Sequence, residues 1–394
     1  MNFKNKFQFS NFVLIGFVCV LLSSCKSEET TIILPLLTTT DVSNISRYSA
    51  ISGGVITSDG GGSIIERGVC WSLTINPTIE NNKTTNGTAI GPFESSITGL
   101  NSGTTYYIRA YATNKAGTGY GSSSVFTTLN NPLDVKTAYM PAGTYTMGSA
   151  TNPKVPLPSE TPHQVTLSAF LMSKYEITNT QYSTFLNKKG VGSDGIYSAG
   201  AYPTKVLIYA SSGESDWGIH YVNSKWVPVS GYENYPIIFV TWWGAMEFAN
   251  YVGGRLPTES QWEYACRAGT VSPFNTGTCL SNEQANYDWS LPYGVCKNTV
   301  STSLGKTQAV GSYSPNAWGL YDMHGNVSEW CYDAYDDYPT TPQIDPQGPI
   351  QGNAARMIRG GSWSQSADIC RSAARFFSGN GYYDYNGFRV VFVP

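Results

Sequence analysis

The stretch from residue 134 to residue 394 has only three short segments with helical spacing of apolar residues, and Gly, Asn and Pro interrupt most of the remainder. The helical segments are expected at 178–186, at 242–251 and from Thr258 onward, where Thr258 and Gln261 fit a capping box. A loop-rich unit of this length needs many side-chain anchors, and the ten Trp of the chain help to supply them. We therefore expect one α+β unit that is rich in loops.

A second folded part, at residues 36–129, has an all-β pattern. Thr and Ser are dense there, and short alternating runs recur, as in Tyr106, Ile108, Ala110 and Ala112. Leu100, Thr104, Tyr106 and Asn114 resemble the late strands of a fibronectin type III domain, in which a Tyr near a strand start bonds back to the preceding corner. We predict a β-sandwich that acts as a spacer, with an adhesive module as the alternative. The sequence Asn-Asn-Pro at 130–132 marks its end.

The first 24 residues read as a targeting signal. Lys4 and Lys6 precede the apolar run 12–22, and small residues lead to Cys25. This ending resembles a bacterial lipoprotein signal, which implies that Cys25 becomes the lipidated first residue. We expect residues 25–35 to form a tether on the outer membrane with the protein exposed at the cell surface. The alternative is an ordinary signal peptide that ends near a Cys.

Charge and cysteine content narrow the partners and the compartment. The formal net charge is −3, only 13% of residues are charged, and no basic stripe is present, so a nucleic-acid partner is not expected. An oxidising compartment permits disulfides, and Cys279 with Cys296 would close a plausible loop. The other cysteines after Cys25 are Cys70, Cys266, Cys331 and Cys370.

Separated blocks of the C-terminal unit carry a family resemblance. They are Met140 to Ser149, Pro162 to Val165, Tyr175 to Asn179, Val240 to Trp242, Arg255 to Ala265, Gly319 to Trp330, Arg359 to Trp363, Arg371 to Arg375 and Gly387 to Arg389. In this order the blocks resemble the formylglycine-generating enzyme, or sulfatase-modifying factor, family. The resemblance spans residues 134–394 and implies a large variant of the C-type lectin fold.

The resemblance does not extend to the copper site of that family. Its enzymes oxidise a sulfatase Cys to formylglycine with copper and oxygen, and two thiolates hold the metal, since soft sulfur ligands select Cu(I). Here the first copper Cys falls on Gln365. The second falls on Cys370 when it is counted forward from Trp363, but Cys370 misses it when it is counted backward from the Ala-Ala-Arg at 373–375. One thiolate is absent in either case, so copper and oxidase activity are not expected.

Two further features follow from the resemblance. Asn326 and Glu329 stand where the family supplies a structural calcium site, and their oxygens suit a hard cation. The alternative is a structural turn in which both residues bond backbone groups. Relatives also carry Cys at the places of Cys266 and Cys370, which makes that pair a second candidate disulfide.

Residues 376–386 consist only of Phe, Ser, Gly, Asn, Tyr and Asp. This is the composition of a binding paratope, in which Tyr brings contact area and Gly and Asn allow varied loop shapes. Every residue of the stretch can be encoded by a codon that ends in a pyrimidine, and randomised adenines of an Asn codon give these types and Ile. Ser364, Ser366, Asp368 and Ile369 fit the same rule, whereas Gln365 does not. The pattern resembles the variable proteins of diversity-generating retroelements.

We therefore expect a non-catalytic, surface-displayed lipoprotein that binds a protein or glycan ligand through residues 363–386. The expected contact residues are Trp363, Ser364, Ser366, Asp368, Phe376, Phe377, Tyr382, Tyr383, Asp384 and Tyr385. Three alternatives stay open: a catalytically dead relative with an aromatic loop, a formylglycine-generating oxidase, and a structural envelope component of the gliding or secretion type.

Overall fold

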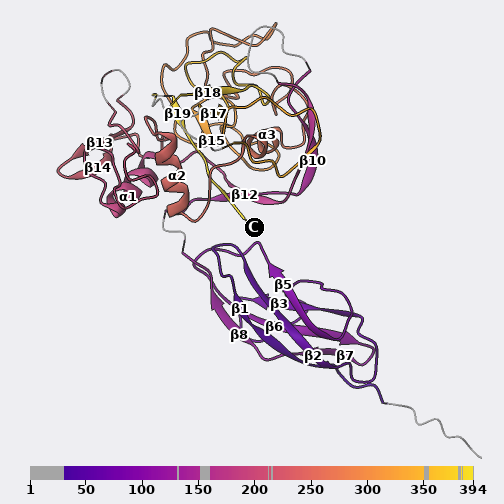
Figure 1. Ribbon diagram of the computed structural model, residues 1–394. Helices are drawn as coiled ribbons and strands as arrows, with labels where there is room; N and C mark the ends of the chain where they lie inside the picture. The colour runs from indigo at the N-terminus through magenta and orange to yellow at the C-terminus, as the bar shows by residue number, and fades with distance from the viewer. Residues whose placement is uncertain are drawn as a thin grey trace, which may run out of the picture.

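The computed structural model describes residues 31–130, 133–150, 160–211, 213, 216–349, 355–379, 383 and 385–393. Figure 1 shows two folded parts, an elongated β-domain formed by the earlier residues and a larger domain of mixed character. The predicted signal, the lipidation site Cys25, and the predicted contact residues Tyr382 and Asp384 lie outside the described residues.

The N-terminal domain is a sandwich of two antiparallel sheets, as its alternating pattern predicted. Its strands are β1 (Leu36–Ser43), β2 (Ala50–Ser58), β3 (Glu66–Ser72), β4 (Asn82–Lys83), β5 (Gly91–Ile97), β6 (Thr105–Asn114), β7 (Gly117–Tyr120) and β8 (Ser124–Thr127). One sheet has the order β1-β2-β5 and the other β4-β3-β6-β7, with β8 also paired to β6. Val69, Ile97 and Ile108 are fully buried between them. The backbone N–H of Asn101 donates to Tyr106 Oη at 2.9 Å, which confirms the predicted Tyr-to-corner bond.

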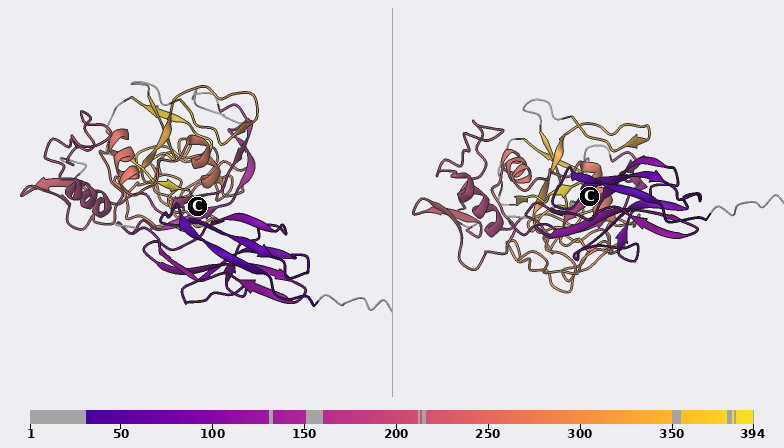
Figure 2. Two further views of the ribbon diagram at one scale, coloured as in Figure 1. Left: turned by 60° about the horizontal axis from the view of Figure 1, so that its bottom comes forward. Right: turned by 90° about the horizontal axis from the view of Figure 1, so that it is seen from below.

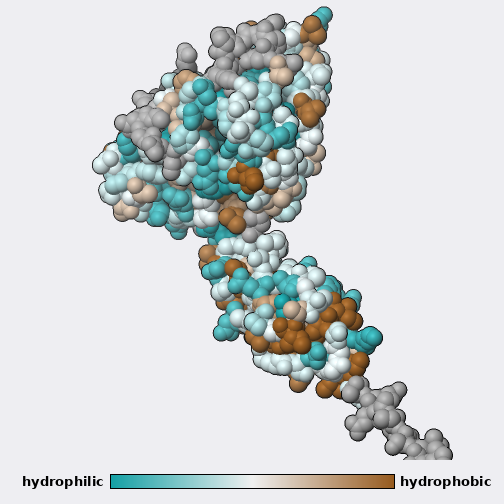
Figure 3. Space-filling view, turned by 45° about the vertical axis from the view of Figure 1, so that its right-hand side comes forward, coloured by the Kyte–Doolittle hydropathy of each residue, from teal (hydrophilic) through white to brown (hydrophobic). Residues whose placement is uncertain are grey.

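The sandwich also exposes large apolar side chains. Those that are more than half exposed are Ile33, Leu36, Ile65, Leu73, Ile75, Ile90, Val125 and Leu129. Figure 3 shows apolar residues gathered on one face of this domain. No helix among the described residues has both the length and the apolar character needed to cross a membrane.

The C-terminal domain combines short strands, three helices and long connections. Its strands are β9 (Thr137–Met140), β10 (Gly143–Met147), β11 (His163–Leu167), β12 (Phe170–Ser173), β13 (Ile219–Val222), β14 (Lys225–Pro228), β15 (Ser328–Ala334), β16 (Gln343–Ile344), β17 (Arg356–Arg359), β18 (Phe376–Ser378), β19 (Asn386–Gly387) and β20 (Val391–Phe392). They form four sheets with the orders β10-β11-β16, β20-β12-β9, β13-β14 and β18-β17-β15-β19.

The helices lie where the sequence pattern predicted them. They are α1 (Asn179–Lys189), α2 (Trp242–Tyr251) and α3 (Glu259–Arg267). At the start of α3 the Thr258 side chain accepts from Gln261 N, and Gln261 Oε1 accepts from Thr258 N at 3.2 Å, so the predicted capping box is confirmed. Such a box satisfies two backbone N–H groups that the first helical turn leaves without partners.

The two domains contact each other through the 46–49 turn of the sandwich. The Tyr48 ring lies 5.3 Å from the ring of Phe392, and Tyr48 Oη donates to Val135 O at 3.4 Å. Only 8% of Tyr48 is exposed, because it joins the apolar core of the C-terminal domain. The two views of Figure 2 show the sandwich projecting from this domain. The two domains are therefore joined by a packed interface as well as by the polypeptide chain.

Candidate functional site

The predicted binding segment, 363–386, connects the two edges of one sheet. Its strands β18 and β19 are consecutive in sequence but lie at opposite edges of the order β18-β17-β15-β19. β18 pairs with β17 through Met357 and Phe377, and β19 pairs with β15 through Ser328 and Asn386. Three strand spacings separate the edges, about 14 Å. Ser378 and Asn386 therefore lie at opposite edges of this sheet.

Ser328 joins the two halves of the segment. Its backbone N–H donates to Tyr385 O at 2.7 Å, and its hydroxyl donates to Gln365 Oε1 at 3.2 Å. The Gln365 carbonyl in turn accepts from Asp288 N at 2.9 Å. Gln365 is thus a scaffold residue, which agrees with its being the exception to the codon pattern. These bonds bring the turn at 363–366 next to the stretch that ends at Tyr385.

The aromatic residues of this junction are partly open to solvent. The rings of Tyr383 and Tyr385 stack with centroids 4.9 Å apart and an interplanar angle of 6°. Tyr383 is 44% exposed, and its carbonyl accepts from Phe239 N at 3.1 Å. Trp363 is half-buried, and its ring meets Trp217 edge-on at 5.6 Å. Because the backbone is held by named bonds while the rings face outward, the junction can present the rings without rearrangement.

We call Trp363, Ser364, Tyr383 and Tyr385 the aromatic surface. Ser364 is exposed, and its hydroxyl lies 3.3 Å from that of Ser362. The structure thus brings four of the predicted contact residues to one junction.

The other described contact residues lie elsewhere. Phe376 and Phe377 are at the far edge of the sheet, where Phe377 is 49% exposed and its ring packs 4.7 Å from that of Tyr335. Phe376 packs against the main core. Ser366 and Asp368 are half-buried in the turn that follows Gln365, beside the buried Ala367. The described members of the ten predicted contact residues therefore do not form one compact site.

Buried Arg–Glu pairs hold the segment, and the sequence reasoning gave them no role. Arg371 binds Glu160 through two bonds of 2.9 and 2.8 Å, and Arg375 binds Glu259 through bonds of 2.7 and 3.0 Å. All four residues are at least nine-tenths buried. Bidentate pairs of this kind fix geometry as well as charge. Five Arg within the last forty residues of a chain with few charges were the available signal, but the partners of Arg371 and Arg375 are far away in sequence.

A cysteine–histidine cluster lies behind the turn at 363–370. Cys266 and Cys370 are fully buried free thiols, so the predicted Cys266–Cys370 disulfide is wrong in this structure. Cys266 Sγ faces the ring of His324 at 3.9 Å and the hydroxyl of Ser372 at 3.5 Å. Cys279 and Cys296 form the disulfide that was expected.

Burial sets the protonation of this cluster. It raises the pKa of Cys266 to about 12 and raises that of Cys370 further, while it lowers the pKa of His324 to about 4. His324 Nε2 accepts from Asn275 N and its Nδ1 lies 2.7 Å from Cys370 O, so the ring is a neutral structural bridge. Both thiols are therefore protonated, and so weakly nucleophilic, at neutral pH.

Comparison with known proteins identifies the C-terminal domain. Residues 125–393 match the model of the sulfatase-modifying factor enzyme 1-like domain. The chain belongs to this family. The formylglycine-generating enzyme of Streptomyces coelicolor is 31% identical over 258 residues, which cover 60% of this chain and 82% of that enzyme.

Two other matches show how widely the domain occurs. A Chlamydia caviae protein named serine/threonine-protein kinase pkn1 is 34% identical over 249 residues, which are 62% of this chain and 35% of that protein. The chain thus spans about a third of the length of this relative. Among solved structures, Treponema denticola variable protein 1 matches with a TM-score of 0.47 and 24% identity, covering 66% of this chain and 95% of that one.

The residue at the expected position of the first copper-binding Cys is not a thiol. Gln365 stands at the first Cys position, and its side chain accepts from Ser328. Among the described residues no group of three or more His, Cys, Asp or Glu is arranged to hold a metal ion. The residues present at 363–375 therefore do not fit a two-thiolate copper site.

The predicted calcium ligands each have protein partners. Glu329 accepts from Arg389 at 2.6 and 2.7 Å and from Trp262 Nε1 at 2.8 Å, so it belongs to a buried ion pair and does not fit a free cation ligand. Asn326 Oδ1 accepts from Asn286 Nδ2 and Gln308 N. Two nearby buried oxygens, Asn286 Oδ1 and Glu176 Oε2, have no hydrogen-bond partner among the described residues. Calcium at Asn326 and Glu329 stays a prediction, and Glu329 would have to bind it from within its ion pair with Arg389.

Proposed function

We propose that this protein is a non-catalytic binding protein of the cell envelope, whose aromatic surface and neighbouring residues of 363–386 contact the ligand. The observation that carries the proposal is the division of labour within this segment. The buried Arg371 and Arg375 and the half-buried Gln365 hold the backbone, while Ser364 and Tyr383 face solvent. A fixed backbone with open Tyr, Trp and Ser side chains suits binding with little ordering cost.

The proposed ligand is a protein or a surface glycan. Stacked Tyr rings and a half-buried Trp supply flat apolar area with polar edges, and Ser364 supplies a hydroxyl. The proposal includes a lipid anchor at Cys25 on the outer membrane, a fibronectin type III-like stalk, and a C-type lectin-like form of the C-terminal domain. Binding without bond making agrees with the protonated, buried thiols of Cys266 and Cys370.

Deep sequencing of the gene across a population of the source bacterium tests the proposal. We expect substitutions at exposed positions such as Ser364, Phe377 and Tyr383, and we expect the buried Arg371 and Arg375 to stay unchanged. The buried positions serve as an internal control for the mutation rate of the gene. A segment that does not vary, or that varies equally at exposed and buried positions, would end the idea of a diversified surface.

The oxidase alternative rests on membership of the family, whose curated relatives include formylglycine-generating enzymes. It predicts stoichiometric copper uptake under reducing conditions and conversion of the Cys in a sulfatase-derived peptide. We expect neither, because only Cys370 is available in the segment and it is buried. A structural envelope component predicts instead an unvarying 363–386 segment and one fixed partner.

A further inference from the structure

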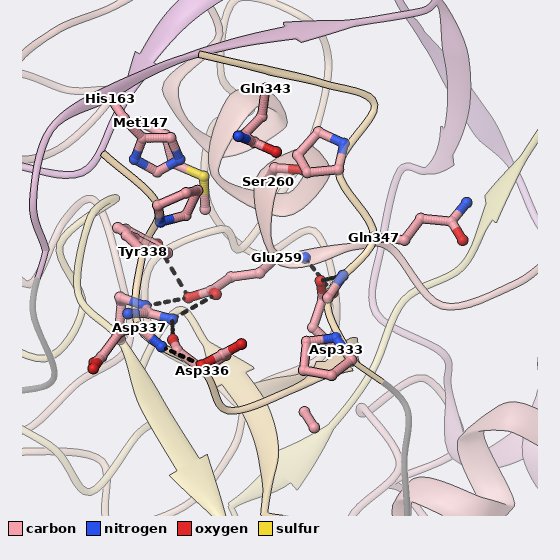
Figure 4. Close-up of a pocket in the computed structure, with 16 residues that line it drawn as sticks. Met147, His163, Glu259, Ser260, Asp333, Asp336, Asp337, Tyr338, Gln343 and Gln347 are labelled. Carbon is pink, nitrogen blue, oxygen red and sulfur yellow. Dashed lines mark hydrogen bonds and ion pairs between the residues drawn. The ribbon is translucent and has the colours of Figure 1, made fainter. Parts of the chain in front are cut away.

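A cavity lies on the other side of β18 from the aromatic surface. It has a volume of about 280 Å³, and Figure 4 shows residues from several separate stretches that converge on it. Its lining includes Met147 and His163 from β10 and β11, Glu259 at the start of α3, and several residues between 333 and 349, from the end of β15 and the chain after it. It shares no residue with the aromatic surface. This volume is near the lower end for ligand pockets, which suits one side chain or one small molecule.

The lining carries more negative than positive charge. Four carboxylates line the cavity, those of Glu259, Asp333, Asp336 and Asp337, against one cation, Arg375. Arg375 is committed to Glu259 through its bidentate pair, and it donates to the backbone carbonyl of Asp336 at 2.8 Å. Asp333, Asp336 and Asp337 form no ion pair with any described residue. The cavity therefore has the electrostatic character of a cation site.

Two carboxylates and one histidine of the lining each have a polar side-chain atom without a hydrogen-bond partner among the described residues. Asp336 Oδ1 accepts from Asp337 N and Asp337 Oδ1 accepts from Tyr335 Oη, so the second oxygen of each carboxylate has no hydrogen-bond partner among the described residues. His163 is only 7% exposed, and its Nδ1 lies 3.1 Å from Thr161 O. Because a carbonyl can only accept, Nδ1 is the donor of this bond, and in a neutral ring Nε2 is then an acceptor. No described residue donates to Nε2, so this buried ring nitrogen of the lining has no hydrogen-bond partner among the described residues.

The walls are apolar and aromatic. The Tyr338 ring lies with its centroid 3.6 Å from the Arg375 guanidinium and 4.8 Å from the His163 ring. Met147 and Pro339 also line the cavity. Such walls suit the methylene stem of an alkyl cation, and the carboxylates of the lining suit its charged head.

We propose that this cavity binds an alkyl ammonium or guanidinium group, either of a small amine or of a Lys or Arg side chain on a polypeptide. The second source has a structural route. Tyr335 connects the mouth to β18, because its hydroxyl donates to Asp337 and its ring packs on Phe377. A polypeptide that covers Phe377 could therefore place a basic side chain in the cavity. The four carboxylates of the lining lie outside 363–386, so the inference does not depend on diversification of that segment.

Because the chain has only three histidines, the NMR resonances of their rings can be assigned and used to follow binding in the cavity. The full-length protein, labelled with ¹³C at the histidine rings, is titrated with n-butylammonium chloride at pH 7.5, with n-butanol as the neutral isostere. His163→Gln and His220→Gln variants assign the resonances. We expect saturable movement of the His163 resonance at millimolar amine, as suits so small a ligand, and no matching movement with butanol.

An Asp336→Asn, Asp337→Asn double variant keeps the shape of the mouth and removes its charge. We expect it to weaken amine binding at least about tenfold. Asp41→Asn in the sandwich, whose carboxylate is exposed, is the matched control and should bind as the parent does. An equal response to butanol, an unaffected double variant, or no shift of His163 would each overturn the proposal.

A blocked tripeptide, Ala-Lys-Ala, distinguishes the two sources. Tighter binding of the peptide than of butylammonium identifies a polypeptide side chain as the occupant. Binding of butylammonium without binding of the peptide identifies a free small amine. The proposed function is tested separately by the sequencing experiment, so either idea can fail without the other.

Discussion

Replacing Glu329 by Gln tests whether this residue is an ion-pair partner, as the structure has it, or a calcium ligand, as the family resemblance implies. Glu329 and Arg389 have side chains that are 1% and 0% exposed, and their closest atoms are 2.6 Å apart. Arg389 also donates to the carbonyls of Ser173 and Tyr321. The Glu329→Gln change would keep one acceptor oxygen but leave the guanidinium charge buried without its counter-ion.

The cost of that change can be estimated from burial. Removing one partner of a buried, hydrogen-bonded ion pair destabilises a protein by about 3–5 kcal/mol. For a domain of this size, each kcal/mol shifts the melting temperature by about 2–4 °C. We therefore expect a loss on the order of 10 °C. Asp134→Asn removes a carboxylate from an exposed pair with Lys136, and it should cost less than about 1 kcal/mol.

Calorimetry of the parent and the Glu329→Gln variant, each with excess calcium and with EDTA, separates the two roles. The ion-pair reasoning predicts the same loss in both buffers. A double variant, Glu329→Leu with Arg389→Met, should be more stable than Glu329→Gln, because it leaves no unpaired charge. If the Glu329→Gln loss disappears in EDTA, Glu329 acts through calcium and the ion-pair reasoning fails.

Three further predictions follow from burial and chain connectivity. Burial, and then the charge of Glu259, raises the pKa of Asp333 from 3.8 to about 6, so the folded state binds this proton more tightly and Asp333 stabilises the fold less as pH rises. Between pH 5 and pH 7 the difference in unfolding free energy between the parent and Asp333→Asn should change by about 1 kcal/mol, in favour of the parent at pH 5, and a difference that urea titrations find independent of pH would contradict the raised pKa. Tyr48→Ala should lower the unfolding free energy of the C-terminal domain by about 3 kcal/mol and loosen the contact between the two domains. An unchanged melting temperature together with an unchanged small-angle scattering profile would contradict a packed interface. Cys279→Ser with Cys296→Ser opens a loop of 17 residues and should cost about 3 kcal/mol in the chain-entropy account, whereas a parent that melts identically with and without reductant would show that the bond carries no stability.

Much of the local structure could be predicted because its signals lie within a few residues. Thr258 and Gln261 are three positions apart, and their reciprocal bonds depend only on the turn between them. The same holds for the bond between Asn101 and Tyr106. The Cys279–Cys296 pair needed only a plausible loop length. In each case the partners are close in sequence, so the pattern itself constrains the contact.

The candidate site was predicted in composition but not in layout. Residues 363–386 do carry exposed aromatic side chains, as their Tyr- and Gly-rich composition indicated. The separation of Phe377 from Tyr383 arises from the order β18-β17-β15-β19, which depends on two strands distant in sequence. Ser328 joins Gln365 to Tyr385, and nothing in the local sequence of any of the three indicates that bond.

The sequence alone determined the elements and the family, because helix caps, strand alternation and short sequence blocks are properties of neighbouring residues. Tertiary structure decided which groups meet. Glu329 forms a buried ion pair with Arg389, and Cys266 stays a thiol beside His324. The acid-lined cavity exists only because β10, α3 and the chain after β15 converge. Such contacts join residues tens to hundreds of positions apart, and burial gives their charges an energetic weight that no local pattern records.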